Sequence, residues 1–288
     1  MQDLKGRTAV VTGAGSGIGL GIARALAREG VNLALADIDG GAAEATREEV
    51  ARLGVQALAL SLDVSDRAAV YRAADEIEAA LGAIHILCNN AGVGSPGVPL
   101  DETPDADLDW MFAVNVFGVL NGIKAFVPKI KRHGAGGHIV NTASIAGLRT
   151  TPGWHIGLYS ATKMSVVALS TGLLEAIGKD GIGVSVLCPA GVDTQIYRSG
   201  RARPARFGGP SAASRRPGEL DRLLKEGLPP DEVGRCVVYA IRQGDMFFIL
   251  THPQTRRWIE DRHRMLMRAY DESDRMVETL GIPRTSQA

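Results

Sequence analysis

The sequence predicts a doubly wound α/β protein whose mostly parallel sheet carries helices on both faces. Short apolar or β-branched runs alternate with longer amphipathic stretches along most of the 288 residues. The runs are apolar almost throughout, which is typical of strands buried on both faces of a sheet. A glycine-rich turn directly follows the first run. Such sheets bind ligands at the carboxyl ends of their strands, so we expect right-handed crossovers and a ligand crevice at that edge.

The predicted elements follow from local periodicity and composition. The first strand, Thr8–Thr12, has the sequence TAVVT, and the spacing of Ile18, Ile22 and Leu26 predicts a helix over residues 16–29. Amphipathic stretches predict two further helices, over 41–53 and 66–81. Short apolar runs between turn-forming segments predict the other strands, at Val31–Ala36, Val55–Leu62, Ile84–Cys88, His138–Thr142, Val184–Cys188 and Phe247–Leu250.

We expect a single domain over residues 1–288, with a core at about 5–250, because no linker or repeat divides the chain. Residues 193–229 depart from the alternation, since they are rich in Arg, Pro, Gly and Ala and too long for an ordinary connection. The segment is either disordered or a lid over the substrate, and its position after the sixth strand favours the lid. A charged helix at about 253–275 lies in a C-terminal extension of about 251–288.

The composition gives no indication of a nucleic-acid, membrane or metal-binding protein. Lys plus Arg and Asp plus Glu each number 32, so the formal net charge is zero. No apolar run reaches the roughly 18 residues of a membrane span, and the first residues lack the apolar core of a signal peptide. The three cysteines form no CxxC pair or disulfide framework, and no His, Cys or carboxylate spacing predicts a metal site. We expect a cytoplasmic protein with none of these partners.

The glycine-rich turn TGAGSGIG at residues 12–19 predicts a dinucleotide-binding site. Glycines let the backbone turn tightly and approach a pyrophosphate, and the following helix directs its free N–H groups and positive dipole end at the phosphates. The turn follows a strand and opens a helix in the first βαβ unit, which is the context of a Rossmann-type site rather than of a plain glycine turn. The residues assigned to this contact are Gly13, Ser16, Gly17, Ile18 and Gly19.

Asp37 lies at the end of the second strand, about 20 residues after the glycines. A carboxylate at this place accepts hydrogen bonds from the adenosine ribose hydroxyls and repels a 2′-phosphate. The next residue, Ile38, is not basic. The pattern therefore favours NAD over NADP, with Asp37 and Ile38 beside the ribose. Asp37 can alternatively cap the helix that follows Gly40, which does not exclude the ribose contact.

Two further strand ends are expected to contact the adenosine half of the cofactor. Asp63 and Val64 follow the third strand, where they suit the edge and face of the adenine. The fourth strand leads into Asn90, Ala91 and Gly92, whose small size suits a backbone lying close to the adenine ribose.

Tyr159 and Lys163 are four residues apart, which places them on one face of a helix. A phenol has a pKa near 10, and a neighbouring ammonium lowers that pKa, so the pair can exchange a proton with an alcohol or carbonyl oxygen. The alternative is an ordinary surface helix. Ser144 follows the fifth strand, and its hydroxyl can hold a substrate oxygen. Asn115 lies in the apolar stretch MFAVNVFGVL and needs a water, a partner or the local backbone to satisfy it.

Taken together, these motifs resemble the short subgroup of the short-chain dehydrogenase/reductase family. The resemblance covers about residues 5–195, with the motifs in the family's order and spacing. The matching pieces are TGAGSGIG at 12–19, Asp37, LDV at 62–64, NNAG at 89–92, Asn115, Ser144 and YSATK at 159–163. The resemblance implies a nicotinamide-dependent alcohol dehydrogenase or ketone reductase.

The resemblance also implies a role for each catalytic candidate. Tyr159 is the general acid/base, and Lys163 lowers its pKa and binds the nicotinamide ribose. Ser144 orients and polarises the substrate oxygen. Asn115 holds a water that links Lys163 to solvent as a proton relay.

By the same resemblance, the turn after the sixth strand holds the nicotinamide amide through Val192 and Thr194. The family pattern there is Pro-Gly, whereas here Ala190 separates Pro189 from Gly191, so the local backbone contacts differ. The remaining residues assigned to the cofactor are Thr142, Tyr159, Lys163, Pro189, Gly191, Val192 and Thr194.

A narrower resemblance connects the chain with bacterial lignin Cα-dehydrogenases, which oxidise the benzylic alcohol of β-aryl-ether lignin dimers with NAD. It rests on GHIVNTAS at 137–144, GIGVSVL at 181–187, RPARF at 203–207 and the charged C-terminal extension. It implies NAD-dependent interconversion of a bulky hydrophobic or aromatic secondary alcohol and its ketone. The expected substrate residues are Ser144, Ile145, Trp154, His155 and Tyr159, although His155 also suits a helix start.

Other functions are compatible with the same motifs. They are an NADPH-dependent carbonyl reductase, which Asp37 opposes, and a steroid or polyketide-type hydroxy dehydrogenase. A nucleotide-binding protein without catalysis is disfavoured because Tyr159, Lys163 and Ser144 are all present. The cluster of Arg198, Arg201, Arg203 and Arg206 either attracts an anionic substrate or lies in a solvated loop, which is the favoured alternative. Family resemblance further implies a homodimer or homotetramer with helices near 101–132 and 153–178 at the interface.

Overall fold

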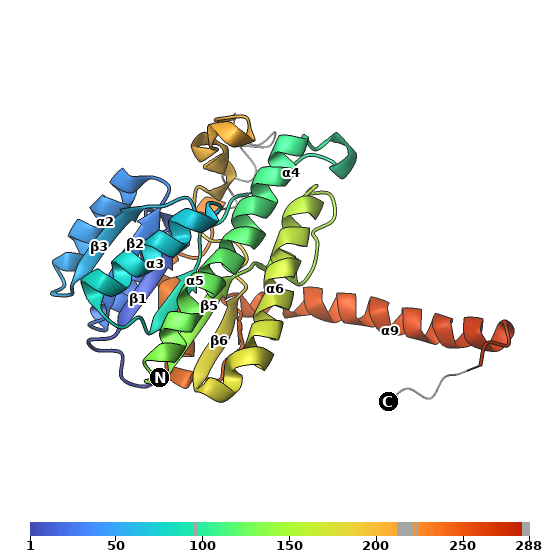
Figure 1. Ribbon diagram of the computed structural model, residues 1–288. Coiled ribbons are helices and arrows are strands. Elements are labelled where there is room, and N and C mark those ends of the chain that lie inside the picture. The colour runs from blue at the N-terminus through green and yellow to red at the C-terminus, as the bar shows by residue number, and fades with distance from the viewer. Residues whose placement is uncertain (95–96, 212–221, 223, 284–288) are drawn as a thin grey trace. The chain divides into compact units, whose positions relative to one another are not determined.

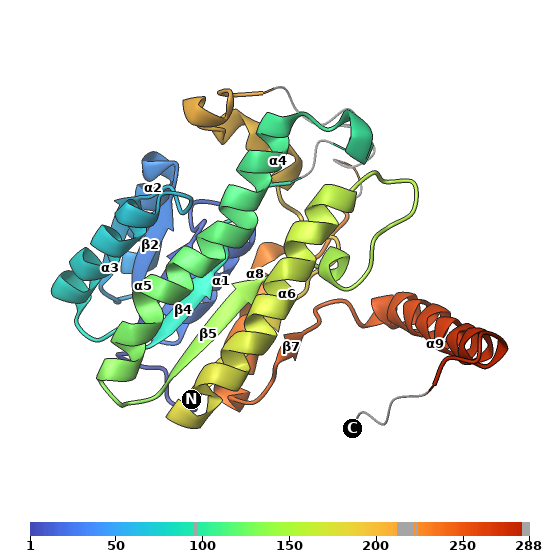
Figure 2. The same cartoon turned by 45° about the vertical axis from the view of Figure 1, so that its right-hand side comes forward.

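A computed structural model of the chain describes residues 1–94, 97–211, 222 and 224–283. The chain divides into two compact units, Met1–Thr251 and His252–Ala288. The first unit holds a seven-stranded sheet between two layers of helices (Figures 1 and 2). All neighbouring strands run parallel, in the order β3-β2-β1-β4-β5-β6-β7. The predicted doubly wound, Rossmann-type architecture is therefore confirmed.

The strands lie close to their predicted positions. They are β1 (Thr8–Thr12), β2 (Asn32–Asp37), β3 (Ala57–Ser61), β4 (Ile86–Asn89), β5 (Gly137–Thr142), β6 (Ile182–Leu187) and β7 (Phe248–Ile249). Three predicted strand starts were wrong by two residues, and the third strand begins at Ala57 and not at Val55. The sixth strand begins at Ile182 because Gly181, with φ of 69°, completes the preceding turn. The fourth begins at Ile86, which pairs with Ala9, whereas Ile84 is buried without a strand partner.

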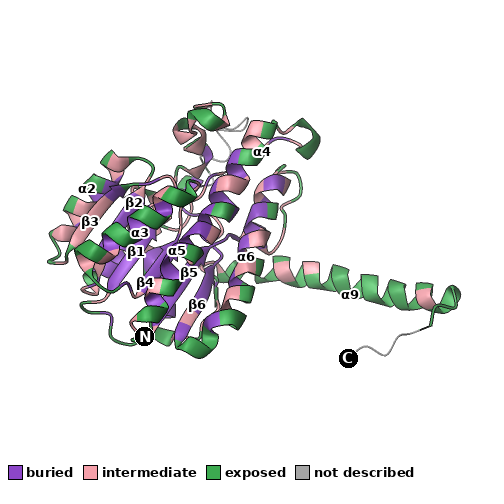
Figure 3. Ribbon diagram, viewed as in Figure 1, coloured by how far each residue is buried: buried purple, intermediate pink, exposed green. Residues whose placement is uncertain are grey.

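Helices cover both faces of the sheet, and burial is concentrated between them and the strands (Figure 3). One apolar core joins the sheet to α1 (Gly17–Arg28), α2 (Gly40–Ala51) and α8 (Pro230–Gln243). The other joins it to α3 (Arg67–Leu81), α5 (Gly118–Arg132) and α6 (Gly157–Ile177). Helices α1 and α8 are packed with their backbones in contact. A Cβ atom on Gly234 would lie 2.1 Å from the carbonyl oxygen of Gly21.

A continuous helix runs from Asp105 to Arg132 through α4 (Asp105–Phe112), a π-helical turn (Ala113–Phe117) and α5. It is long and apolar enough to cross a membrane by length and composition, with a mean hydropathy of 1.5 over its most apolar window. However, 67% of that window is buried within the protein. Its apolar face packs in the core of the domain, so the composition of this helix reflects a core position.

The second unit contains a short 3-10 turn, Pro253–Thr255, and helix α9, Arg256–Thr279. The predicted helix at about 253–275 thus begins three residues later and ends four residues later. No residue of α9 is buried (Figure 3).

Candidate active site

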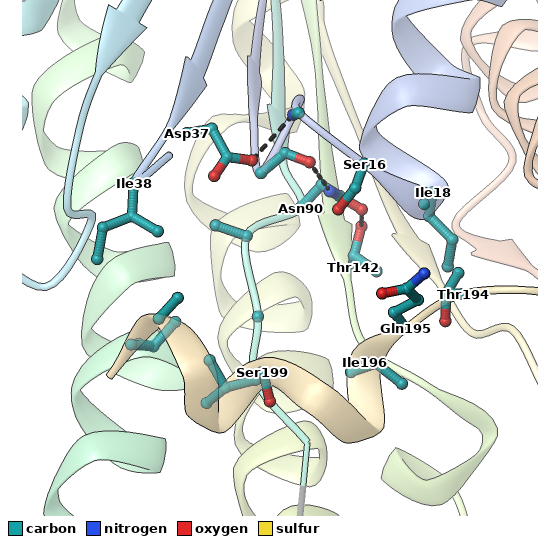
Figure 4. A pocket seen from close by; sticks show the side chains of 18 of the residues that line it. Ser16, Ile18, Asp37, Ile38, Asn90, Thr142, Thr194, Gln195, Ile196 and Ser199 are labelled. Carbon is teal, nitrogen blue, oxygen red and sulfur yellow. Dashed lines mark hydrogen bonds between the residues drawn. The ribbon is translucent and has the colours of Figure 1, made fainter. Parts of the chain in front are cut away.

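The cleft of the first unit lies at the carboxyl ends of the strands, where the strand order reverses between β1 and β4. Chains that leave β1 and β4 turn in opposite directions at such a point, so a crevice opens between them. The cleft has a volume of about 360 Å³ and is lined by the loops after β1 to β6. Figure 4 shows side chains from the ends of several strands directed into this space, facing a short helix that carries Ile196 and Ser199.

The glycine-rich turn after β1 forms a cradle that side chains would fill. Gly13 and Gly17 adopt φ of 65° and 52°, a conformation that residues with a Cβ atom rarely adopt. A Cβ atom on Gly19 would lie 1.9 Å from the carbonyl oxygen of Gly13. Ser16 precedes α1 without capping it through its side chain. The first N–H groups of α1 therefore point toward the cleft as a ready site for a phosphate.

Asp37 ends β2 with its carboxylate beside the glycine turn. One oxygen, Oδ2, accepts the backbone N–H of Gly15 at 2.9 Å, and the other accepts that of Asp39 at 3.0 Å. The N-cap of α2 is Asp39, whose carboxylate accepts the N–H of Ala42. The alternative assignment of Asp37 as the helix cap is therefore wrong, and its carboxylate remains at the rim of the cleft together with Ile38.

A network of hydrogen bonds joins the loops after β1 and β4. The hydroxyl of Thr12 accepts the backbone N–H groups of Asn90 and Ala91 at 3.0 and 3.1 Å. The amide nitrogen of Asn90 donates to the carbonyls of Thr12 and Gly13. Thr142 completes the network by donating to the side-chain oxygen of Asn90 at 3.4 Å. Sequence reasoning did not identify Thr12, because only the pairing of β1 with β4 shows which loop its hydroxyl meets.

Lys163 is buried on α6 and donates from Nζ to the carbonyl of Thr142 at 2.9 Å. Its Nζ lies 5.7 Å from the centre of the Tyr159 ring. A Cβ atom on Gly92 would come within 3.3 Å of Lys163 Nζ and 3.2 Å of Asn115 Oδ1. Because Gly92 has no side chain, the space next to Lys163 Nζ and Asn115 Oδ1 stays unfilled.

Asn115 is fully buried in the π-helical turn between α4 and α5. Its Oδ1 accepts the N–H of Val93 at 2.8 Å, and its Nδ2 donates to the carbonyl of Val93 and to the hydroxyl of Thr162. Protein groups therefore already satisfy most of the hydrogen-bonding capacity of this side chain. The water expected at Asn115 must bind either to its backbone or to the second lone pair of Oδ1. π-Helical turns within α-helices often occur at functional sites.

Tyr159 and Ser144 meet beside this lysine. Burial raises the pKa of the Tyr159 phenol to about 12, while a hydrogen bond from Ser144 acts in the opposite direction. Burial lowers the pKa of Lys163 to about 8, so its ammonium form still predominates at pH 7. The Ser144 hydroxyl accepts the N–H of Ala146 at 3.1 Å and lies 3.4 Å from the carbonyl of Pro189. A phenol, a hydroxyl and an ammonium therefore converge at one end of the cleft.

Comparison with known proteins supplies the family of this chain. Residues 7–205 match the sequence model of the short chain dehydrogenase family. The chain belongs to this family.

Two curated members of the short-chain dehydrogenase family are similar along most of their length. The C alpha-dehydrogenase of Sphingobium sp. (strain NBRC 103272 / SYK-6) is 35% identical over 263 residues, which cover 90% of this chain and 85% of that protein. The 1-deoxy-11-beta-hydroxypentalenate dehydrogenase of Streptomyces exfoliatus is 37% identical over 231 residues, covering 80% and 82%. The chain is therefore an oxidoreductase that acts on an alcohol or its ketone, and the predicted likeness to Cα-dehydrogenases is confirmed.

A solved structure of the family shows the same fold. The short chain dehydrogenase/reductase from Burkholderia phymatum in complex with NAD superposes with a TM-score of 0.87 at 37% identity, covering 93% of this chain and 96% of that one. The cleft of this short-chain dehydrogenase fits a nicotinamide dinucleotide. The glycine cradle matches a pyrophosphate, Asp37 matches a ribose, and the space beside Gly92 borders Lys163.

The segment after β6 crosses the cleft of this dehydrogenase. Two short 3-10 helices, Ile196–Ala202 and Ala205–Phe207, lie there. The Ser199 hydroxyl accepts the N–H of Gly94 at 3.0 Å, which joins the segment to the loop after β4. The predicted substrate segment extends to residue 229, but residues 212–221 and 223 lie outside the part that the structure describes.

Two arginines attach this segment to the body of the domain. The guanidinium of Arg203 pairs with Asp107 of α4, and both side chains are largely buried. Arg206 pairs with Asp63 after β3 at 2.6 Å. Ion pairs therefore hold these two arginines to the body of the domain, an arrangement that neither alternative for the arginine cluster included.

Most predicted site residues border the cleft. Those that do are Gly13, Ser16, Gly17, Ile18, Asp37, Ile38, Asp63, Val64, Asn90, Ala91, Gly92, Thr142, Ser144, Tyr159, Lys163, Pro189, Val192 and Thr194. Gly19, Asn115 and Gly191 are not among the lining residues. Gly191 accepts the N–H of Leu228 and so shapes the turn after β6.

Three predicted substrate residues, Ile145, Trp154 and His155, do not border the cleft in this structure. His155 has φ of 48° and lies in the loop just before α6, which matches its alternative place near a helix start. Conversely, Trp110 and Val114 on the long helix line the cleft and were not predicted. The segment after β6 was predicted only as a whole, and its lining residues are Gln195, Ile196, Ser199, Arg201, Ala202 and Leu224.

Proposed function

We propose that this dehydrogenase uses NAD to interconvert a bulky hydrophobic or aromatic secondary alcohol and its ketone. The observation that carries the proposal is the convergence of Tyr159, Ser144 and Lys163 at one end of a cleft whose other end is a glycine cradle. NAD supplies the hydride acceptor when bound. The side chains of the protein then need only position the alcohol and remove its proton.

In the proposed oxidation, the substrate hydroxyl lies between Ser144 and Tyr159. The Ser144 hydroxyl donates to the substrate oxygen and holds it in place. The Tyr159 phenolate accepts the proton of the substrate hydroxyl and becomes a phenol. The carbon loses its hydrogen as a hydride, with two electrons, to NAD. In the reverse direction the phenol returns that proton to the carbonyl oxygen. The Lys163 ammonium stabilises the phenolate, since an adjacent cation favours the charged form.

The preference for NAD rests on the carboxylate of Asp37. Its Oδ2 is held by the N–H of Gly15 beside the glycine turn, where the ribose of the adenosine half is expected. A 2′-phosphate at this position would meet a negative charge, and the neighbouring Ile38 offers no compensating cation. The same charge disfavours an NADPH-dependent carbonyl reductase, which is kept only as the second candidate.

The substrate class rests on the apolar lining and on the relatives. Trp110, Val114, Ile196 and Leu224 give the cleft large apolar surfaces near the segment after β6. The likeness to a C alpha-dehydrogenase favours a benzylic Cα alcohol of lignin-type aryl ethers. The likeness to a hydroxypentalenate dehydrogenase keeps polycyclic alcohols, such as steroid or polyketide-like ones, as the alternative.

The direct test is absorbance at 340 nm with NAD or NADP and a panel of secondary alcohols. NADH formation with a β-aryl-ether benzylic alcohol is the expected result. Activity with polycyclic or aliphatic alcohols alone would preserve the mechanism and overturn the aryl-ether assignment. If no alcohol reacts, ketones with NADH and NADPH test the reductase alternative.

A further inference from the structure

Helix α9 carries an apolar stripe on one side, interrupted by Arg262 and Ser273. Exposed large side chains include Met265, Leu266, Tyr270 and Met276, with 64%, 48%, 69% and 52% of their surface accessible. At 100° per residue, the apolar residues of positions 258–280 other than Met267 fall within an arc of about 140°. They are Trp258, Ile259, Met265, Leu266, Ala269, Tyr270, Met276, Val277 and Leu280. The described residues of the second unit include no other long helix that could cover this stripe.

The stripe is symmetric about the middle of the helix. Pairs of apolar residues lie at 258–259 and 265–266 on one side of the midpoint, and at 269–270 and 276–277 on the other. Reversing the helix end to end about a point between Met267 and Arg268 superposes these pairs on one another. A two-fold axis at this midpoint would therefore bring every apolar pair opposite another apolar pair.

The two halves of α9 on either side of the same midpoint carry net charges of opposite sign. Residues 256–268 contain five arginines and two acidic residues, whereas residues 269–280 contain four acidic residues and one arginine. An antiparallel pair of identical helices places each basic half beside the acidic half of its partner. A parallel pair would place like halves together, which is unfavourable.

We propose that α9 is a self-association surface that pairs antiparallel with α9 of a second copy of this chain. The two apolar stripes form the contact, and the opposite charges of the two halves set the direction. Because the same surface serves both partners, the contact closes as a two-fold dimer. No residue of α9 is among those that line the cleft, and the proposal does not depend on the proposed substrate or cofactor.

Disulfide trapping in the full chain tests the direction of pairing. The two variants are Ile259→Cys and Met276→Cys, each in a Cys236→Ser background, because Cys88 and Cys188 are buried. In the antiparallel pair, residue 259 lies opposite residue 276 of the second copy. In a parallel pair these two positions are about 25 Å apart along the axis, and each lies opposite itself.

The expected result is a disulfide between differently tagged chains when the two variants are co-expressed, and little in either variant alone. Self-cross-linking of each single variant would overturn the antiparallel arrangement. Absence of any cross-link would mean that another surface covers the stripe and would overturn the proposal.

A second measurement tests the surface without cross-linking. We expect Leu266→Glu to halve the molar mass of the assembly in light scattering, because it places a charge in the middle of the stripe. The matched control is Met267→Glu, since Met267 is also exposed but points away from the stripe. Retained turnover shows that both variants are folded, and an unchanged mass for Leu266→Glu would contradict the pairing.

Discussion

The Tyr159 phenol is partly buried at the cleft and has a pKa raised to about 12, so nearly all of it is protonated at neutral pH in the absence of cofactor. This state suits proton donation to a ketone directly. Alcohol oxidation instead requires the phenolate, so Lys163 and Ser144 contribute most in that direction.

We expect Tyr159→Phe to lower kcat for alcohol oxidation by about 100-fold or more, because the proton acceptor is lost while the ring is kept. Cofactor affinity, measured by quenching of protein fluorescence, should stay within a few-fold of the wild type. Retention of most of kcat would contradict the assignment of Tyr159 as the acid/base.

The pH dependence should differ between the two directions. Since the phenolate fraction rises with pH while the pKa of Tyr159 lies well above neutrality, kcat/KM for oxidation should rise by up to about tenfold per pH unit from pH 7 to about pH 8. Above that pH the rise should flatten, because Lys163, with a pKa of about 8, loses the charge that stabilises the phenolate. Reduction needs the protonated phenol and should show no such rise. Initial rates in both directions between pH 6 and 10 measure this, and parallel profiles would argue against Tyr159 as the titrating group.

Replacement of Asp37 by Ala should narrow the ratio of kcat/KM for NAD over NADP, because it removes the charge that opposes a 2′-phosphate. The matched control is Asp39→Asn, which keeps an oxygen to cap α2 and leaves Asp37 in place. An unchanged ratio in Asp37→Ala would remove the argument for NAD.

The two short 3-10 helices after β6 depend on tertiary contacts for their position. Arg203 pairs with Asp107 and donates to the carbonyl of Gly209 at 2.7 Å. Both partners of the ion pair are largely buried, so removal of one leaves the other charge without compensation. The segment carries Ile196 and Ser199 at the cleft, and its stability should therefore influence ligand binding.

We expect Arg203→Ala to raise KM for cofactor and substrate more than it lowers kcat, and to speed proteolytic cleavage within residues 196–211. Arg222→Ala is the matched control in the same segment, because its ion pair with Glu226 is highly exposed and contributes little. Equal effects of the two variants in steady-state kinetics would show that the Arg203–Asp107 pair does not hold the segment.

The stability of the whole domain should depend on pH through His138, which is fully buried on β5. Burial lowers the pKa of His138 from 6.5 to about 4. Between these values the unfolded chain binds more protons than the folded one. The contribution of His138 to the free energy of unfolding is therefore fully present above pH 6.5. This contribution decreases as the pH falls toward 4, by up to about 3 kcal/mol.

Urea unfolding at pH 7.5 and pH 5 measures this loss. We expect His138→Leu to reduce the difference between the two free energies of unfolding, because the titrating group is removed. The Ser185 hydroxyl remains satisfied in the variant through its bond to the carbonyl of Met246 at 2.6 Å. A difference as large as that of the wild type would assign the acid sensitivity to other groups.

Local patterns were enough to predict the alternation of elements, the glycine turn and the acid/base pair. Each depends on neighbours in the sequence, such as the four-residue spacing of Tyr159 and Lys163 on α6. Strand bounds were less accurate, because an apolar residue such as Ile84 can be buried in the core without a strand partner. Apolarity indicates burial, whereas hydrogen-bond register determines where a strand begins.

Contacts between residues distant in the sequence could not be predicted. Asn89 donates to Asn141 at 2.9 Å, and Asn141 donates to Ser170 at 3.0 Å, which links β4, β5 and α6 through buried amides. Likewise, Trp110 borders the cleft while Trp154 does not. Sequence distance carries no information about such neighbours, since loops are placed by the elements they join and by long-range pairs.

Sequence periodicity and motif spacing were therefore sufficient for the architecture, the cofactor cradle and the identity of Tyr159, Lys163 and Ser144 as candidates. Packing of the chain was needed to bring Thr12 under the β4 loop, to pair Arg203 with Asp107, and to give Tyr159 its raised pKa. The reason is that propensity and spacing act over a few residues, whereas desolvation and ion pairing depend on atoms that meet only after folding.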